Sequence, residues 1–168
     1  QAQAFRLLGS AVKEALGEPD LAAMLDELAR LSAVASKHEE HVDLLENIAP
    51  DIFDGDLQTE VLMRAASLAE SPLEQTERAR RFYQRVLEVR PDHEQALDAL
   101  DALQAGAGDY DALLETLRRK TELAETPAER VALLERRADI RENEMSDVSG
   151  AIDAMEGVLV EDPHRTSA

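Results

Sequence analysis

The chain has 168 residues, and its 18 Lys and Arg against 36 Asp and Glu give a formal net charge of −18 at pH 7. An acidic surface repels phosphates, so neither nucleic acid nor an anionic membrane surface is an expected partner. The lack of cysteine excludes disulfides, thiolate metal sites and thiol nucleophiles in this sequence. No run approaches the ~18 apolar residues of a membrane-spanning helix, so membrane insertion is not expected.

The spacing of apolar residues predicts that the whole chain is α-helical. Hydrophobic residues make up 44% of the sequence and aromatic residues only 3%, which is typical of helices packed through small and aliphatic side chains. Glycine and proline separate the helices. In the connector 50–55, Phe53 is expected to plug between neighbouring hairpins. The predicted helices span residues 3–16, 21–36, 37–49, 57–70, 74–89, 94–105, 110–124, 127–143 and 147–160.

Short polar residues in front of the predicted helices mark their starts. Asp20 and Asp109 stand directly before apolar-periodic runs, where a side-chain oxygen can accept from a free backbone N–H group. Thr126 opens a capping box, with proline at the first helical position. The same pattern predicts that Ser71 begins the fifth helix and that Ser146 caps the last one.

The sequence repeats at a fixed interval. Pro91 lies at the end of the helix predicted in the stretch ARRFYQRVLEVRPD. Pro19 and Pro163 stand at equal distances before and after Pro91 (91 − 19 = 163 − 91 = 72), and we call this interval the repeat period. Residues 62–68 align without gaps with residues 134–140 at the same offset, so the two pairs of segments share one register. Such a period predicts stacked helical hairpins rather than one closed core. The repeated positions are Ala79 and Ala151, Tyr83 and Met155, Val86 and Val158, and Pro91 and Pro163.

These hairpins resemble tetratricopeptide repeats. Ala79, Tyr83, Val86 and Pro91 stand at that family's second-helix positions for small, aromatic, small and proline residues. Alanine at the closest crossing lets two helices approach, and proline ends the hairpin where the chain turns into its neighbour. The hairpin that begins at Glu94 carries further family positions at Leu97, Leu100, Gly108, Tyr110 and Leu117.

The resemblance implies an all-α fold, an α-solenoid of antiparallel hairpins forming one repeat domain over residues 1–168. We expect this domain to be a fragment of a longer bacterial multi-repeat protein. A HEAT-like or other α-solenoid is the nearest alternative. The sequence departs from the family pattern at His41, Asp101, Leu113 and Lys120, which affects the curvature of the superhelix. The predicted parts are a leading helix at 1–19, hairpins at 20–55, 56–93, 94–126 and 127–163, and a tail at 164–168.

No pattern indicates a reaction, so we expect neither an enzyme nor a bound cofactor or metal. His38 and His41 lie three residues apart on one predicted helix, whereas the zinc motif HExxH separates its histidines by four. Asp51, Asp54 and Asp56 surround a glycine but fail the spacing of a calcium loop. We interpret these three aspartates as turn and cap residues.

The surface that the resemblance assigns to binding is the concave groove lined by the first helices of the hairpins. Its mixture of arginine and aspartate suits a peptide with charges of both signs. Arg64 and Arg136 fit a structural role equally well, by pairing with nearby acids. The predicted groove residues are Asp26, Arg30, Arg64, Gln95, Asp98 and Arg136.

We therefore expect a non-catalytic scaffold that binds a peptide or helix of a protein partner. Two alternatives stay open. One is a structural spacer or self-assembly segment that associates through exposed repeat ends. The other is an accessory domain of an enzyme whose catalytic part lies elsewhere. A cytoplasmic location is favoured.

Overall fold

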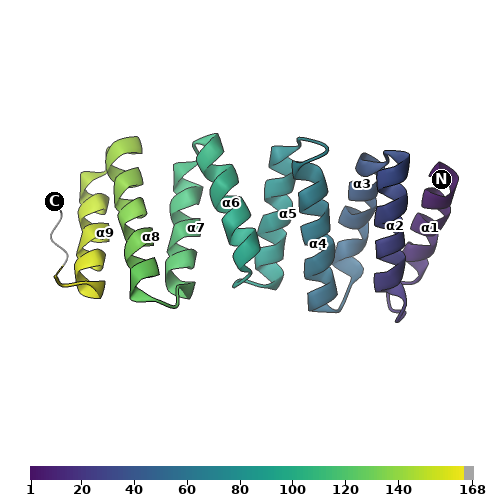
Figure 1. Ribbon diagram of the computed structural model, residues 1–168, viewed down its shortest axis with the longest axis horizontal. Helices are drawn as coiled ribbons and strands as arrows, with labels where there is room; N and C mark the ends of the chain where they lie inside the picture. Colours follow the sequence, from purple (N-terminus) through teal and green to yellow (C-terminus); the bar gives the residue numbers. More distant parts are fainter. Residues whose placement is uncertain (165–168) are drawn as a thin grey trace. The chain divides into compact units, whose positions relative to one another are not determined.

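Every regular element of the chain is a helix in the computed structural model, which describes residues 1–164 (Figure 1). No strand occurs in this range, so the predicted all-α class is confirmed. A 3₁₀ turn (Ala49–Asp51) follows α3, and a π-helical turn (Ile140–Glu144) follows α8. The α-helices of the described range are α1 (Ala2–Glu14), α2 (Leu21–Ala35), α3 (His38–Ile48), α4 (Gly55–Glu70), α5 (Thr76–Val89), α6 (Glu94–Ala107), α7 (Tyr110–Leu123), α8 (Pro127–Asp139) and α9 (Val148–Glu161).

The chain divides into two compact units, Gln1–Ala96 and Leu97–Ala168. In the first unit α1 packs on α2, α2 on α3, α3 on α4 and α4 on α5, and these neighbours run antiparallel (Figure 1). In the second unit α7 packs on α8 and α8 on α9. Packing between consecutive helices is what helical hairpins predict, whereas their superhelical stacking along the whole chain stays a prediction.

The repeat period is also present in the helix boundaries. α3, α4 and α5 begin at His38, Gly55 and Thr76, and α7, α8 and α9 begin at Tyr110, Pro127 and Val148. Each start in the second set lies one period after its counterpart. α5 and α9 also share a length of 14 residues. We call α2–α5 the first block and α6–α9 the second block, and the two can be compared position by position.

Aliphatic side chains on facing helices form the interior of each unit. In the first unit Leu28 and Leu45 are fully buried. In the second unit Leu113 and Leu117 of α7 pack against Ile140, which follows α8. Burying a side chain of this size stabilises the fold by about 1.5–3 kcal/mol. These contacts hold the helices in the positions from which their polar side chains project.

Alanine lies at equivalent buried positions of the second helices. Ala79 on α5 and Ala151 on α9, which stand one period apart, are 0% and 6% exposed. Ala151 packs together with Ala138 of α8 and with Ala154. Because a methyl group adds little bulk, helix axes can approach closely at such positions. Both residues predicted at helix crossings are therefore in the interior.

Side-chain caps mark the starts of α4, α7 and α8. The Thr126 hydroxyl accepts from the backbone N–H of Glu129 at 3.2 Å, and the Glu129 carboxylate accepts in return, which confirms the predicted capping box. Asp109 accepts from the backbone N–H of Ala112 at 3.4 Å, as predicted. Asp54 accepts from two backbone N–H groups at 2.9 Å, so α4 begins two residues earlier than predicted.

α5 and α9 both begin after a residue with left-handed backbone conformation. Glu74 has φ of 55°, which keeps it out of the helix, so α5 begins at Thr76 and the predicted Ser71 start is wrong. Ser146, one period after Glu74, has φ of 56°. Asp147 caps α9 in its place, accepting from a backbone N–H group at 2.9 Å. The predicted Ser146 cap is therefore wrong by one residue.

Two further predictions about loops are wrong. Phe53 is 100% exposed rather than plugged between hairpins, and its neighbour Ile52, 4% exposed, enters the interior instead. Asp20 precedes α2 as predicted, but its backbone is already helical and its side chain makes no capping hydrogen bond. The end of the predicted tail, residues 165–168, lies outside the described residues.

Candidate functional site

A pocket of about 520 Å³ lies in the first unit between α2 and α4, with side chains of α3 completing its wall. α2 and α4 are the first helices of successive predicted hairpins, the elements to which the resemblance assigns the binding groove. Two of the six predicted groove residues line it. The lining side chains are Asp26, Ala29 and Ala33 from α2, His38 and His41 from α3, and Glu60, Met63, Arg64, Ser67 and Leu68 from α4.

Arg64 joins α4 to α2 at the rim of the pocket. Its Nη2 donates to Asp26 Oδ1 at 2.6 Å and to the Glu60 carboxylate one turn earlier on α4. Burial alone would lower the pKa of Arg64, but the hydrogen bonds to Asp26 and Glu60 outweigh burial and raise it. Arg64 is therefore a permanent cation, and with two carboxylates beside it the rim has a net negative charge.

His41 lies in the wall of the pocket and is only 1% exposed. Neither of its ring nitrogens has a hydrogen-bond partner among the described residues. Burial, followed by the nearby positive charges of Arg64 and His38, lowers its pKa to about 4. The ring of Phe5 on α1 meets the imidazole edge-on, with centroids 6.0 Å apart. His41 is therefore a neutral, buried and unsatisfied polar group at neutral pH.

The two blocks differ in the partner of an equivalent arginine. The counterpart of Arg64 is Arg136, and the counterpart of Ala29 is Asp101, each one period later. Arg136 donates twice to the Asp101 carboxylate, at 2.7 and 2.6 Å. Ala29 has no such acceptor, so Arg64 pairs instead with the exposed Asp26. In the first block Ala29 lines the pocket instead.

The other predicted groove residues do not line this pocket. Arg30 pairs with Glu27 on its own helix, at 2.6 Å. Asp98 pairs with Lys120 of α7 at 2.8 Å. Arg136 holds the buried Asp101, which is the structural role weighed for it from the sequence. Gln95 is exposed on α6. Of the six residues, Asp26 and Arg64 pair directly, and Asp98 and Arg136 are linked through Lys120 and Asp101.

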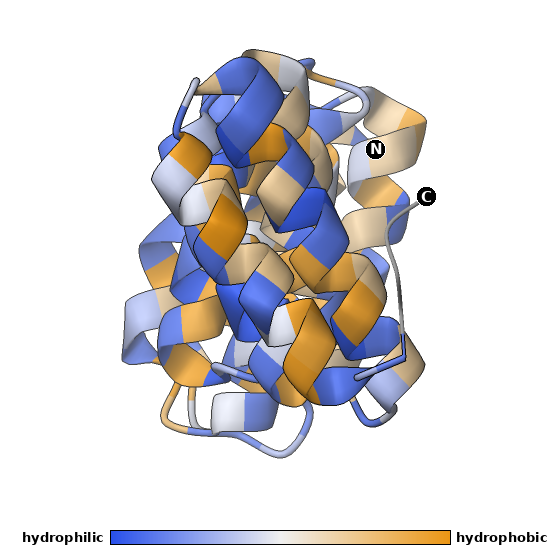
Figure 2. Cartoon of the chain, turned by 90° about the vertical axis from the view of Figure 1, so that its left-hand side faces the viewer, coloured by the Kyte–Doolittle hydropathy of each residue, from blue (hydrophilic) through white to orange (hydrophobic). Residues whose placement is uncertain are grey.

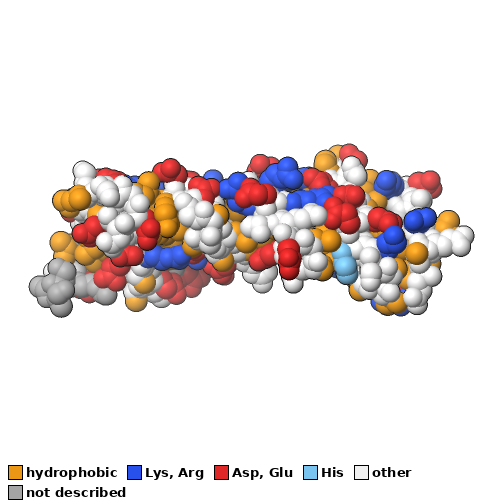
Figure 3. Space-filling view, turned by 90° about the horizontal axis from the view of Figure 1, so that it is seen from above, with side chains coloured by type: hydrophobic (Ala, Val, Ile, Leu, Met, Phe, Trp, Pro, Cys, Tyr) orange, Lys and Arg blue, Asp and Glu red, His pale blue; other side chains and the backbone are white. Residues whose placement is uncertain are grey.

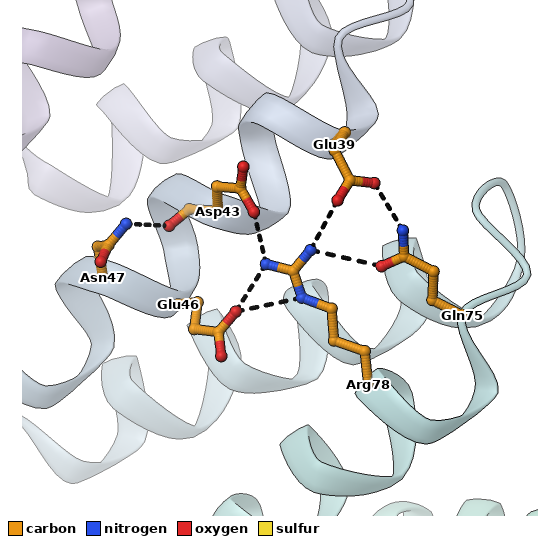
Figure 4. Close-up of polar contacts among 6 residues, drawn as sticks. All are labelled: Glu39, Asp43, Glu46, Asn47, Gln75 and Arg78. Atoms are coloured by element: carbon orange, nitrogen blue, oxygen red, sulfur yellow. Dashed lines mark hydrogen bonds and ion pairs between the residues drawn. The ribbon is translucent and has the colours of Figure 1, made fainter.

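A second polar cluster in the first unit joins α3 to α5 (Figure 4). The Arg78 guanidinium donates to Asp43 at 2.6 Å, to Glu46 at 2.6 and 3.1 Å, and to Glu39 at 3.0 Å. Gln75 donates to Glu39 as well, at 2.7 Å. Acidic and basic side chains lie side by side on the face above α3 to α5 (Figure 3). This cluster, which the sequence did not predict, fastens two helices of the unit.

Arg78 is 14% exposed in its side chain, and its guanidinium carbon lies 5.8 Å from the centre of the buried Phe82 ring. A cation over an aromatic face adds attraction to the ion pairs. Three carboxylates already occupy its donors, so the cluster has no free cation to offer a ligand. We therefore treat it as structural and the α2–α4 pocket as the candidate site.

His38 and His41, considered above as a metal site, have no third metal-ligating side chain beside them in the described range. No group of three or more His, Cys, Asp or Glu side chains suited to a metal ion is found in the described range 1–164. Asp54 of the calcium-like aspartates acts as the cap of α4. None of the helices in the same range has both the length and the apolar character needed to cross a bilayer.

Neither a scan against protein-family models nor a search of curated proteins finds a match for this chain. The candidate site therefore has to be interpreted from its own chemistry. The sequence indicated that His41 departs from the family pattern but did not predict that it lines a pocket. The available signal was the gapless alignment of the two blocks, which sets His41 against Leu113 and Ala29 against Asp101.

Proposed function

We propose that the chain is a non-catalytic interaction module that binds a peptide or helix of a protein partner over the pocket between α2 and α4. This is the function implied by its resemblance to tetratricopeptide repeats. The observation that carries the proposal is a buried His41 without hydrogen-bond partners in the wall of a pocket of about 520 Å³. Leaving a buried polar group unsatisfied costs about 1–3 kcal/mol, and binding a partner there offsets this cost.

Two features of the pocket favour a peptide. Ala29, Ala33, Met63 and Leu68 give it an apolar wall, and methionine adapts its shape to different side chains. The rim has both signs of charge on Arg64 and the acids beside it. An apolar pocket with a charged rim is the usual form of a site that anchors one side chain of a docked segment.

Selection of peptides against the whole chain tests the proposal. A displayed library of random peptides is selected on the wild type, and the binders are measured against Ala33→Trp. Ala33 is exposed at the pocket, so a tryptophan there fills the site without disturbing the interior. Ala105→Trp is the matched control, because Ala105 is the exposed counterpart of Ala33 in the second block.

The expected result is a set of peptides whose affinity falls at least about tenfold in Ala33→Trp and stays unchanged in Ala105→Trp. Peptides that bind both variants equally well would show that the pocket is not the binding site. A selection that yields no binder at all counts against the proposal in the same way.

A second candidate function, self-association, is favoured by the apolar face of α9. Val148, Ile152 and Leu159 are 61%, 54% and 49% exposed, and with the partly buried Met155 they recur at helical spacing. Figure 2 faces the side on which α9 lies and shows hydrophobic segments there. Contiguous exposed apolar residues are typical of interfaces.

Light scattering over a dilution series tests this candidate. If the wild type has the mass of a monomer at every concentration, and Ile152→Asp has the same mass, self-association is excluded.

A further inference from the structure

The wall of the α2–α4 pocket limits the chemistry of a group that can reach His41. Burial and, after it, the nearby Arg64 disfavour a positive charge on the imidazole, and they disfavour a positively charged ligand group beside it for the same reasons. Asp26 and Glu60 at the rim repel a carboxylate or phosphate. The group that fits beside His41 is therefore uncharged.

The hydrogen-bonding needs of His41 narrow the choice further. A neutral imidazole has one N–H donor and one acceptor nitrogen, and both lack partners here. A hydroxyl group both donates and accepts, so it can bond to either nitrogen. The ring nitrogens have almost no exposed surface, so the hydroxyl has to be carried inward on an apolar body. Met63 lines the pocket and can move to admit that body.

An aromatic ring meets these requirements better than an aliphatic chain. The pocket volume of about 520 Å³ exceeds that of a single ring, and Ala29 and Ala33 add little bulk to the side that α2 supplies. The Met63 sulfur gains energy from contact with an aromatic edge. Serine and threonine carry their hydroxyl on the first side-chain carbon, so they reach less far into a pocket than tyrosine does. A phenol combines a large apolar body with one hydrogen-bonding tip.

We propose that the α2–α4 pocket selects a tyrosine side chain of the partner, whose phenol hydroxyl bonds to the imidazole of His41. This inference rests on the proposed function, because it names the side chain that the docked peptide inserts. Leu113, the counterpart of His41, cannot make such a bond, so the selectivity belongs to the first unit alone.

Titration with small phenols tests the inference without knowledge of the partner. The whole chain is titrated with p-cresol, which is the tyrosine side chain, and with toluene, which lacks only the hydroxyl. Nitrogen NMR of the histidine rings reports whether His41 gains a hydrogen bond. His41→Leu removes the imidazole and keeps an apolar side chain of the type found at Leu113. Ala33→Trp and Ala105→Trp serve as the blocked pocket and its control.

We expect p-cresol to bind at least about fivefold more tightly than toluene, to shift the ring nitrogens of His41, and to lose this advantage in His41→Leu. Ala33→Trp should abolish p-cresol binding and Ala105→Trp should not, which keeps the test decisive if His41→Leu folds poorly. Equal affinity for the two compounds, no binding of p-cresol, or binding without a change at His41 would overturn the inference.

The two proposals fail in different ways. Selected peptides that depend on the pocket but lack tyrosine would preserve the interaction module and overturn the selectivity for phenol. Selective binding of p-cresol together with a peptide selection that yields no binder would preserve the chemistry of the pocket and overturn the interaction module.

Discussion

His41 and Leu113 hold the same position in the two blocks, and each is 1% exposed. One is an imidazole with no hydrogen-bond partner, and the other is an apolar side chain packed against Ile140. At the same position, therefore, the second block buries an apolar leucine, whereas the first block buries a polar group whose unsatisfied nitrogens cost stability.

Replacement of His41 by leucine should stabilise the protein. The variant removes two unsatisfied buried nitrogens, which is expected to raise the free energy of unfolding at pH 7 by about 1–3 kcal/mol. Urea denaturation of wild type and variant measures the difference. A variant less stable than the wild type would show that the imidazole makes favourable contacts, and would contradict our interpretation of His41 as unsatisfied.

The same pair of proteins should differ in pH dependence. The pKa of His41 is lowered to about 4 in the folded state against its ordinary value of 6.5, so the unfolded state binds the proton more readily. Wild-type stability should therefore fall as pH drops from 6.5 to 4, by on the order of 3 kcal/mol. His41→Leu lacks this contribution, so its advantage over wild type should widen across that window. A constant difference between the two proteins would mean that His41 does not titrate as described.

Asp101 offers an ion pair whose contribution can be measured against a matched control. Burial alone raises the pKa of Asp101, but hydrogen bonds from Arg136 and Lys120 outweigh burial and lower it. Asp101→Asn should reduce the free energy of unfolding by about 1–2 kcal/mol at pH 7. Asp98→Asn, on the same helix, removes only an exposed partner of Lys120 and should cost at most about 0.5 kcal/mol.

The cost of Asp101→Asn should disappear in acid. A carboxyl with a lowered pKa stabilises the fold above its unfolded pKa of about 3.9, and this contribution is lost as pH falls through the folded value. Wild type and Asp101→Asn should therefore converge in stability as pH falls below the unfolded value and through the lowered folded pKa of Asp101. Denaturation curves at neutral and acid pH check this, and a gap that persists in acid would indicate a loss of packing rather than of charge.

Arg78→Met tests whether the α3–α5 cluster stabilises the first unit. The substitution keeps much of the apolar stem over Phe82 but leaves Glu39, Asp43 and Glu46 without their shared cation. We expect a loss of about 1–3 kcal/mol at low salt, because three carboxylates then repel one another. At ~1 M salt the loss should shrink, since exposed charges are screened. Arg81→Met, at an exposed position of the same helix, is the control and should be nearly neutral.

The sequence predicted the helices well because each signal was local. Apolar spacing and the evenly spaced prolines place α3 to α5 and α7 to α9 within a few residues. The starts of α5 and α9 were predicted two residues and one residue too early, because Glu74 and Ser146 take positive φ without being glycine or asparagine. The Arg78 cluster was missed because its acidic partners lie 32 to 39 residues earlier in the chain. The sequence placed Asp26 and Arg64 in the groove but not His41, because only the comparison of the two blocks sets His41 against Leu113.

Ala79→Leu and Ala151→Leu test the register of the second helices in both blocks. Each replaces a methyl group by an isobutyl group at a buried position, where there is no room for extra carbons without displacing neighbouring side chains. Overpacking of this kind should cost about 1–3 kcal/mol for each variant, measured as the shift in urea denaturation. Ala132→Leu, on the exposed side of α8, is the control and should change stability little, because leucine is nearly as good a helix former as alanine. If both buried variants are as stable as the wild type, the closest helix crossings lie elsewhere, and the alanines that support the tetratricopeptide resemblance lose their physical reason.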